Sequence, residues 1–228
     1  MQKKLKWNAI GLVRKTKLLR DFIKIEKDNI PIDHKNKLSK QKGFLDELNH
    51  LLDRMEMIEK ILIPKLQDFF RLQFPTPELI MFALSRPSIR NIFEDLNTHF
   101  KNDVNRPLSE EEMAELASSG DAAEVLALLG DAALDLAVIQ LFWKPSLSNT
   151  GKLTKKRESI ASNLSLSKYC DDWGLCGYRL NRFKRVETPE ITEKKIIHEK
   201  GTLVEAILGV IYLEFEYEKI LETVTLFQ

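Results

Sequence analysis

Apolar residues recur at steps of three and four along much of the chain, which is the spacing of an amphipathic α-helix. The clearest run extends from Phe44 to Phe69, and Pro64 predicts a kink inside it. Strict alternation of apolar and polar residues, the pattern of a half-buried strand, is scarce. Since the chain has only 9 glycines and 8 prolines to interrupt such helices, the pattern predicts an all-α protein.

Two prolines interrupt the helical pattern near residue 75 and indicate how the chain is divided. Pro75 and Pro77 are separated by one residue, and closely spaced prolines end a helix. We therefore predict a helical N-terminal extension over residues 1–75 and a second domain over residues 76–228.

The second domain contains a strong helix-start signal at Ser109. Glu112 follows at the spacing of a capping box, and the acidic residues after Ser109 suit the positive end of a helix dipole. Further helices are predicted over residues 77–87, 153–173 and 200–220, with a loop over residues 144–154.

The stretch LALLGDAALDLAV, residues 126–138, is nearly all apolar yet carries a glycine and two aspartates. Helical spacing places Asp131 and Asp135 one turn apart. Gly130 inside a helix costs about 1 kcal/mol relative to Ala. A glycine and a carboxylate at such a position therefore need a structural or chemical reason.

A second apolar stretch, GTLVEAILGVIYLE, holds a single internal carboxylate at Glu205. Removing an ionised carboxylate from water is costly unless the group is paired or binds a cation. Carboxylates on two apolar helices are what a site for a hard divalent cation requires. The alternative is that these acids lie on helix surfaces and pair with neighbouring lysines.

Charge is distributed unevenly although the chain is nearly neutral. Its 35 Lys and Arg residues against 34 Asp and Glu residues give a formal net charge of +1. Residues 1–42 alone carry 13 basic and 4 acidic residues, so a basic arm precedes an acidic body. Such an arm has an anionic partner, or it packs on the acidic body itself.

Cysteine content and hydropathy indicate the cellular compartment in which the protein is expected. Cys170 and Cys176 form neither a metal-binding spacing nor a disulfide framework, so we interpret both as core thiols in a reducing compartment. No uninterrupted apolar run approaches the length of about 18 residues that a membrane span requires, and the N-terminus lacks a secretory cleavage pattern. These features predict a cytoplasmic protein with no membrane partner.

The block AAEVLALLGDAALDLAV, residues 122–138, resembles the signature helix of the ribonuclease III family. Three further blocks follow the family order, and they are FALSRPS (82–88), GKLTKKRESIASNLSL (151–166) and VEAILGVIYLE (204–214). The resemblance covers about residues 76–228 and leaves the N-terminal extension unexplained. It implies a divergent ribonuclease III-like endonuclease domain, and no C-terminal double-stranded-RNA-binding domain is expected.

The resemblance also implies a dimer that holds duplex RNA and uses Mg²⁺ to cut phosphodiester bonds. In the family, four carboxylates hold the metal. Two of them fall on Asp131 and Glu205, which we therefore predict as catalytic and metal-binding residues. Leu128 occupies the position of an interface Phe of the family, so a homodimer contact is predicted there.

The other two family carboxylates are absent. Ala127 stands where the family has Glu, and Thr202 stands where it has Asp. This predicts an RNA-binding protein with weak or absent endonuclease activity. The alternative is an active Mg²⁺-dependent endoribonuclease, for which Glu124 and Glu199 offer a displaced ligand pair. Whether the protein is an enzyme stays open at this point.

Basic residues near the third block are predicted to contact RNA phosphates. The predicted contacts are Lys152, Lys155, Lys156 and Arg157, and a second basic cluster comprises Arg179, Arg182, Lys184 and Arg185. The alternative is that these residues form a solvated face that pairs with the acidic segment 110–124. Similarly, the basic arm either replaces an RNA-binding domain or packs on the acidic body.

Overall fold

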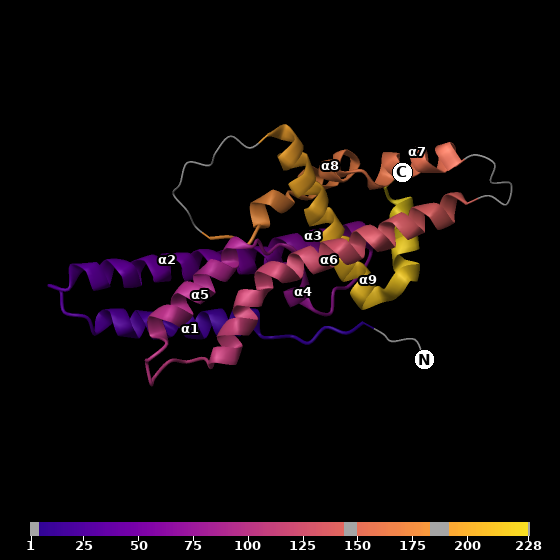
Figure 1. Ribbon diagram of the computed structural model, residues 1–228. Helices are drawn as coiled ribbons and strands as arrows, with labels where there is room; N and C mark the ends of the chain where they lie inside the picture. Colours follow the sequence, from indigo (N-terminus) through magenta and orange to yellow (C-terminus); the bar gives the residue numbers. More distant parts are fainter. Residues whose placement is uncertain (1–4, 144–149, 183–191, 228) are drawn as a thin grey trace.

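The computed structural model describes residues 5–143, 150–182 and 192–227, and these are helical with no strand (Figure 1). One isolated β-bridge joins Ser85 to Leu180 within this part of the chain. The predicted all-α fold class is confirmed. The elements are α1 Leu12–Asp28, α2 Lys35–Met57, a π-helical segment Ile58–Leu62, α3 Ile63–Phe70, α4 Pro77–Ala83, α5 Ser88–Phe100, α6 Glu110–Phe142, α7 Thr150–Ala161, α8 Asn163–Trp173, a 3-10 turn Leu175–Tyr178 and α9 Glu193–Thr225.

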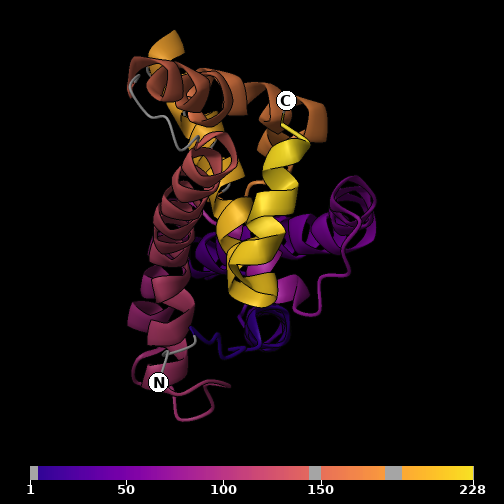
Figure 2. The same cartoon turned by 90° about the vertical axis from the view of Figure 1, so that its right-hand side faces the viewer.

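Two long helices, α6 and α9, cross at the centre of the molecule (Figures 1 and 2). Helices α4, α5 and α7 pack on α6, and α8 packs on α9. Helices α1 and α2 lie side by side and form a hairpin that extends from this body (Figure 1). The structure therefore combines a central helix crossing with a helical hairpin that extends from it.

Two glycines allow the backbones of α6 and α9 to touch. A Cβ atom added at Gly130 would lie 1.8 Å from the carbonyl oxygen of Glu205, and one added at Gly209 would lie 2.0 Å from that of Leu126. Both distances are far below van der Waals contact. Gly130 is therefore required by the crossing, and this close approach places the neighbouring Asp131 beside α9.

The N-terminal extension is attached to the body through polar groups at the start of α1. Gly11, the N-cap residue, has a φ of 74° and provides no side chain to cap the helix. Glu78 of α4 supplies the missing acceptor, because its carboxylate accepts hydrogen bonds from the amides of Ile10 and Leu12. The carboxylate also suits the positive end of the α1 dipole.

A buried lysine makes a second attachment between the extension and the body. Lys15 is only 4% exposed, and its Nζ lies 2.6 Å from Glu115 and 3.6 Å from Glu112 of α6. Part of the basic arm thus packs on the acidic body, as one of the two sequence interpretations expected. Hydrophobic residues of both segments form one core, so the division at residue 75 stays a prediction.

Helix boundaries differ from the sequence prediction at several places. The helix predicted over residues 77–87 ends at Ala83, and the one predicted over residues 200–220 extends over Glu193–Thr225. A π-helical segment, Ile58–Leu62, precedes Pro64, and the kink predicted there stays a prediction. The single run predicted over residues 153–173 is two helices, because Ser162 caps the start of α8. The predicted loop is shorter, since α7 begins at Thr150; residues 144–149 lie outside the described residues.

One described helix is long and apolar enough to cross a membrane by length and composition. It is α6, whose most apolar window of 18 residues has a mean hydropathy of 1.9. Since 39% of that window is buried in the structure, and core helices of soluble proteins pass the same test, this is weak support for a membrane span.

Candidate active site

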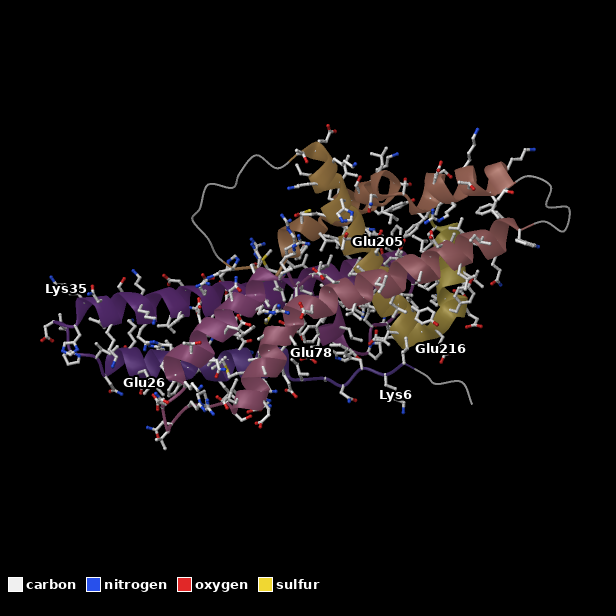
Figure 3. The ribbon with its side chains drawn as sticks, in the orientation of Figure 1. Lys6, Glu26, Lys35, Glu78, Glu205 and Glu216 are labelled. Atoms are coloured by element: carbon white, nitrogen blue, oxygen red, sulfur yellow. The ribbon has the colours of Figure 1, made fainter. Side chains whose placement is uncertain are left out.

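Three carboxylates gather where α6 and α9 cross. Asp131 and Asp135 lie one turn apart on α6, and both act through their charge on Glu205 of α9. Figure 3 labels Glu205 at the crossing. Burial, followed by the charges of Asp131 and Asp135, raises the pKa of Glu205 to about 7. Burial and then Asp135 also raise the pKa of Asp131. Mutual repulsion of this kind is typical of carboxylates arranged around a cation or a proton.

Arg157 of α7 binds one member of this group. Its Nε donates to Asp135 Oδ1 at 2.6 Å, and its Nη2 donates to Oδ2 of the same carboxylate. The hydrogen bonds to Asp135 raise the pKa of Arg157. The ion pair joins α7 to α6. Arg157 also acts on Asp131 through its charge, which favours the ionised form of that carboxyl. Among the described residues, neither Asp131 nor Glu205 forms an ion pair of its own.

The sequence interpretation missed the role of Asp135. It had placed Arg157 among the RNA-contacting residues, whereas the guanidinium here forms a bidentate ion pair. A signal existed, because Asp135 stands one helical turn after Asp131. What the sequence could not supply was the position of α7 relative to α6. Direct RNA contact by Arg157 stays a prediction.

The two substituted positions contribute no further carboxylate. Ala127 is 5% exposed, and the Thr202 hydroxyl donates to the carbonyl oxygen of His198 at 3.0 Å. Among the described residues, no group of three His, Cys, Asp or Glu side chains could hold a metal ion. Asp131 and Glu205 are the carboxylates at the crossing that could hold an Mg²⁺ ion, if water and substrate phosphate supplied the remaining ligands.

The displaced ligand pair suggested by the sequence is not assembled. Both carboxylate oxygens of Glu199 are engaged, one with Arg86 and one with Arg179, each at 3.1 Å. Glu124 is exposed on α6. Glu199 is thus held by two arginines, and neither residue belongs to a described cluster that could bind a metal ion.

The predicted RNA-contacting lysines lie on α7. Lys152 and Lys155 are exposed, and Lys156 Nζ lies 4.6 Å from the centre of the Phe142 ring at the end of α6. In the second basic cluster, Arg182 pairs with Glu47 of α2 and with Asp95 of α5, so it joins the extension to the body. Lys184 and Arg185 lie outside the described residues.

Residues 124–216 match the family model of the ribonuclease III domain. This part of the chain is a ribonuclease III domain. No curated protein matches the chain. The matched span begins inside α6 and ends at Glu216, where a φ of 66° interrupts the helical geometry of α9. The ribonuclease III match thus contains the crossing of α6 and α9, and helices α1–α5 precede it.

The outer face of α6 in the ribonuclease III domain is apolar and exposed. Leu128 is 72% exposed and Val125 is 65% exposed, although both belong to the central helix. A groove of about 580 Å³ lies beside this face. Its lining includes Leu129, Leu136 and Tyr212. Exposed apolar area of this kind is typical of a protein interface.

The two cysteines are free and close together. The Sγ atoms of Cys170 and Cys176 lie 3.8 Å apart, without a disulfide bond. Burial, followed by Cys176, raises the pKa of the Cys170 thiol to about 12. Cys170 is therefore an unreactive core thiol, as predicted, while Cys176 is partly exposed.

Proposed function

We propose that this protein binds structured or double-stranded RNA as a homodimer and cleaves it slowly or not at all. Its ribonuclease III domain indicates a family of endonucleases that process double-stranded RNA. The observation that carries the proposal is the donor set at the crossing. Asp131 and Glu205 are present there, and Ala127 and Thr202 occupy the other two positions at which the family resemblance expects carboxylates.

Loss of two ligands should weaken catalysis more than it weakens RNA binding. Mg²⁺, when bound, would activate a water molecule and stabilise charge on the phosphodiester. Asp131 and Glu205 would hold it from one side. With fewer ligands the ion and its water are less firmly oriented, and a misplacement of about 1 Å can cost about 100-fold in rate.

The alternative, an active Mg²⁺-dependent endoribonuclease, is favoured by one specific observation. Burial, followed by the charges of Asp131 and Asp135, raises the pKa of Glu205 to about 7, so at neutral pH a cation would compete with a proton for this site. Carboxylates with perturbed pKa values in close proximity are candidates for a functional site. The two proposals differ in rate and not in substrate.

Duplex RNA binding is supported by the exposed lysines of α7. Lys152 and Lys155 lie on the solvent side of α7, while the same helix is joined to the metal-binding region through Arg157. Lysines in such positions neutralise phosphates without reading sequence, and each contact makes binding more sensitive to salt. We therefore expect affinity to depend on RNA charge and shape.

Homodimerisation is supported by the apolar outer face of α6. Leu128 and Val125 would lose their contact with water if a second copy packed against this face, and each buried apolar side chain contributes about 1.5–3 kcal/mol. Leu is smaller than the Phe expected from the family resemblance, so the groove beside Leu136 would be filled differently.

Binding of a long duplex RNA at several salt concentrations tests the proposal. We expect tight binding in low salt, and weaker binding to all duplex sequences when Lys152, Lys155 and Lys156 are replaced by Gln. The charge-conserving Arg variants serve as the matched control. Parent-like affinity of the Gln variant would assign these lysines to a solvated face, and rapid Mg²⁺-dependent cleavage by the unmodified protein would favour the alternative.

A further inference from the structure

A second cluster of basic side chains lies far along the chain from the ribonuclease III match, on helix α2. Its members are Lys35, Lys37, Lys40 and Lys42, and all four are exposed. Within the described residues, no ion pair joins any of them to a carboxylate. We call these residues the α2 lysine cluster. Figure 3 labels Lys35 near the far end of the α1–α2 hairpin.

Some basic residues of this protein are held by acidic partners within the fold, unlike the lysines of the α2 lysine cluster. Lys15 is buried between two glutamates, and Arg157 and Arg182 form ion pairs with acids on neighbouring helices. The charges of these three residues therefore have a role in holding the fold together. Such a role does not account for four lysines within eight residues of one helix, of which Lys40 alone has a described contact, its Nζ lying 5.8 Å from the centre of the Phe44 ring. Lys37 and Lys40 stand at the i,i+3 spacing at which like charges repel.

The position of the cluster within α2 adds to this cost. Lys35 begins the helix, and no acidic residue lies in its first turn. Positive charges in the first turn of a helix oppose the helix dipole, and Lys35 and Lys37 lie in that turn. An anionic partner would relieve this dipole interaction and the repulsion between Lys37 and Lys40.

A groove adjoins one member of the cluster, Lys40. It has a volume of about 620 Å³, lies between α2 and α5, and has Lys40 at one side and Arg182 among its lining residues. His99 also lines it, and burial, followed by the positive charges of Lys40 and Lys37, lowers the pKa of this imidazole. Glu47 and Asp95 line the groove as well, but Arg182 pairs with both.

We propose that the α2 lysine cluster, with the adjoining groove between α2 and α5, is a second contact surface for the phosphate backbone of RNA. This inference rests on the proposed function, because RNA is the anionic polymer that a ribonuclease III domain would bring to the molecule. The contacts would be independent of sequence, since lysine ammonium groups bind phosphate as point charges.

The salt dependence of RNA binding measures such contacts directly. The parent protein is compared with a variant that carries Lys35→Gln, Lys37→Gln, Lys40→Gln and Lys42→Gln, with one long duplex RNA as the probe. Each phosphate contact adds about 0.9 to the slope of log affinity against log salt. We expect the Gln variant to bind more weakly and to lose up to about 3 to 4 from that slope.

A charge-conserving variant is the matched control. Replacing the same four lysines by Arg should keep the salt slope of the parent, because the positive charges remain. Thermal unfolding of both variants checks that the hairpin is intact. Loss of Lys charges near the helix start should leave α2 equally stable or slightly more stable.

The outcomes separate this inference from the proposed function. Parent-like affinity and slope in the Gln variant, while the parent binds RNA, would overturn the inference alone. Absence of RNA binding by the parent would overturn both. A second experiment measures binding of the same proteins to vesicles rich in phosphatidylserine. If the Gln variant loses vesicle binding but keeps its RNA binding, the cluster belongs to a membrane surface, and the inference is contradicted.

Discussion

The crossing of α6 and α9 and the α1–α2 hairpin are two helix pairs that are built in opposite ways. At the crossing, Gly130 and Gly209 bring two backbones into contact. In the hairpin, side chains such as Leu19, Ile23 and Leu48 fill the space between helices and are fully or almost fully buried. The backbone contact fixes the position of α6 relative to α9. The hairpin instead depends on side-chain volume, which other hydrophobic residues of similar size could provide.

This difference explains why one region is recognisable from sequence and the other is not. A backbone contact tolerates only glycine at each position, so the crossing leaves a sequence pattern around Asp131 and Glu205. A hydrophobic interface accepts many residue combinations of suitable volume. The same difference applies to function, because carboxylates at the crossing are placed by a rigid contact, whereas the lysines of α2 lie on a solvated surface.

The largest expected effect contrasts one substitution in the two regions. Gly130→Ala would push a methyl group against the Glu205 carbonyl, so we expect destabilisation by more than about 3 kcal/mol or loss of folding. Gly43→Ala in α2 meets no atom within 4 Å and should stabilise the protein by up to about 1 kcal/mol. Chemical denaturation measures both. Equal effects of the two substitutions would contradict the comparison.

A smaller effect is expected at the exposed face of the same helix. Leu128→Asp should leave the fold of the monomer intact, because Leu128 is 72% exposed, but it would place a charge in the proposed dimer contact. Sedimentation at tens of micromolar should therefore show a dimer for the parent and a monomer for the variant. A parent that sediments as a monomer would remove the homodimer from the account.

The smallest expected effect is the pH dependence contributed by Glu205. Its pKa is raised from 4.5 to about 7 in the folded protein, so the folded state binds this proton more tightly than the unfolded state. The stabilisation is complete below the unfolded pKa and is lost as the pH rises through about 7. Relative to Glu205→Gln, the parent should therefore lose thermal stability between these values.

Magnesium sharpens this measurement. At a pH above 7, addition of Mg²⁺ should restore part of the lost stability of the parent, because a ligand that binds the folded state stabilises it. The Glu205→Gln variant should respond much less, since it lacks one of the two carboxylates. Parallel pH curves for the two proteins would show that Glu205 does not titrate in this range. Equal responses to Mg²⁺ would show that Glu205 does not bind the ion.

Much of the fold was predictable because local patterns agree with it. Helical periodicity predicted the all-α class, and the capping box at Ser109 marks the start of α6 with both of its hydrogen bonds formed. Contacts between distant residues were not predictable. The capping of α1 by Glu78 and the burial of Lys15 depend on how α1 docks on the body, and no periodicity in the sequence encodes that docking.

The candidate site shows the same division. Asp131 and Glu205 could be predicted because each stands in a recognisable block, and Gly130 has its explanation in the backbone contact. The partners of Glu199 could not be predicted, because Arg86 and Arg179 reach it from segments that are far apart in the sequence. Basic residues look alike in a sequence, and only the structure separates those held in ion pairs from those exposed to a ligand.

Cleavage of a long duplex RNA in Mg²⁺ tests the central claim most directly, with the parent compared with a variant carrying Ala127→Glu and Thr202→Asp. The added carboxylates would lie at i,i+4 and i,i+3 from Asp131 and Glu205, which places each pair on one helix face. We expect little or no cleavage by the parent and Mg²⁺-dependent cleavage by the double variant, with smaller gains from each single variant. Rapid cleavage by the parent, or a folded, RNA-binding double variant without activity, would contradict the claim that two missing carboxylates limit catalysis.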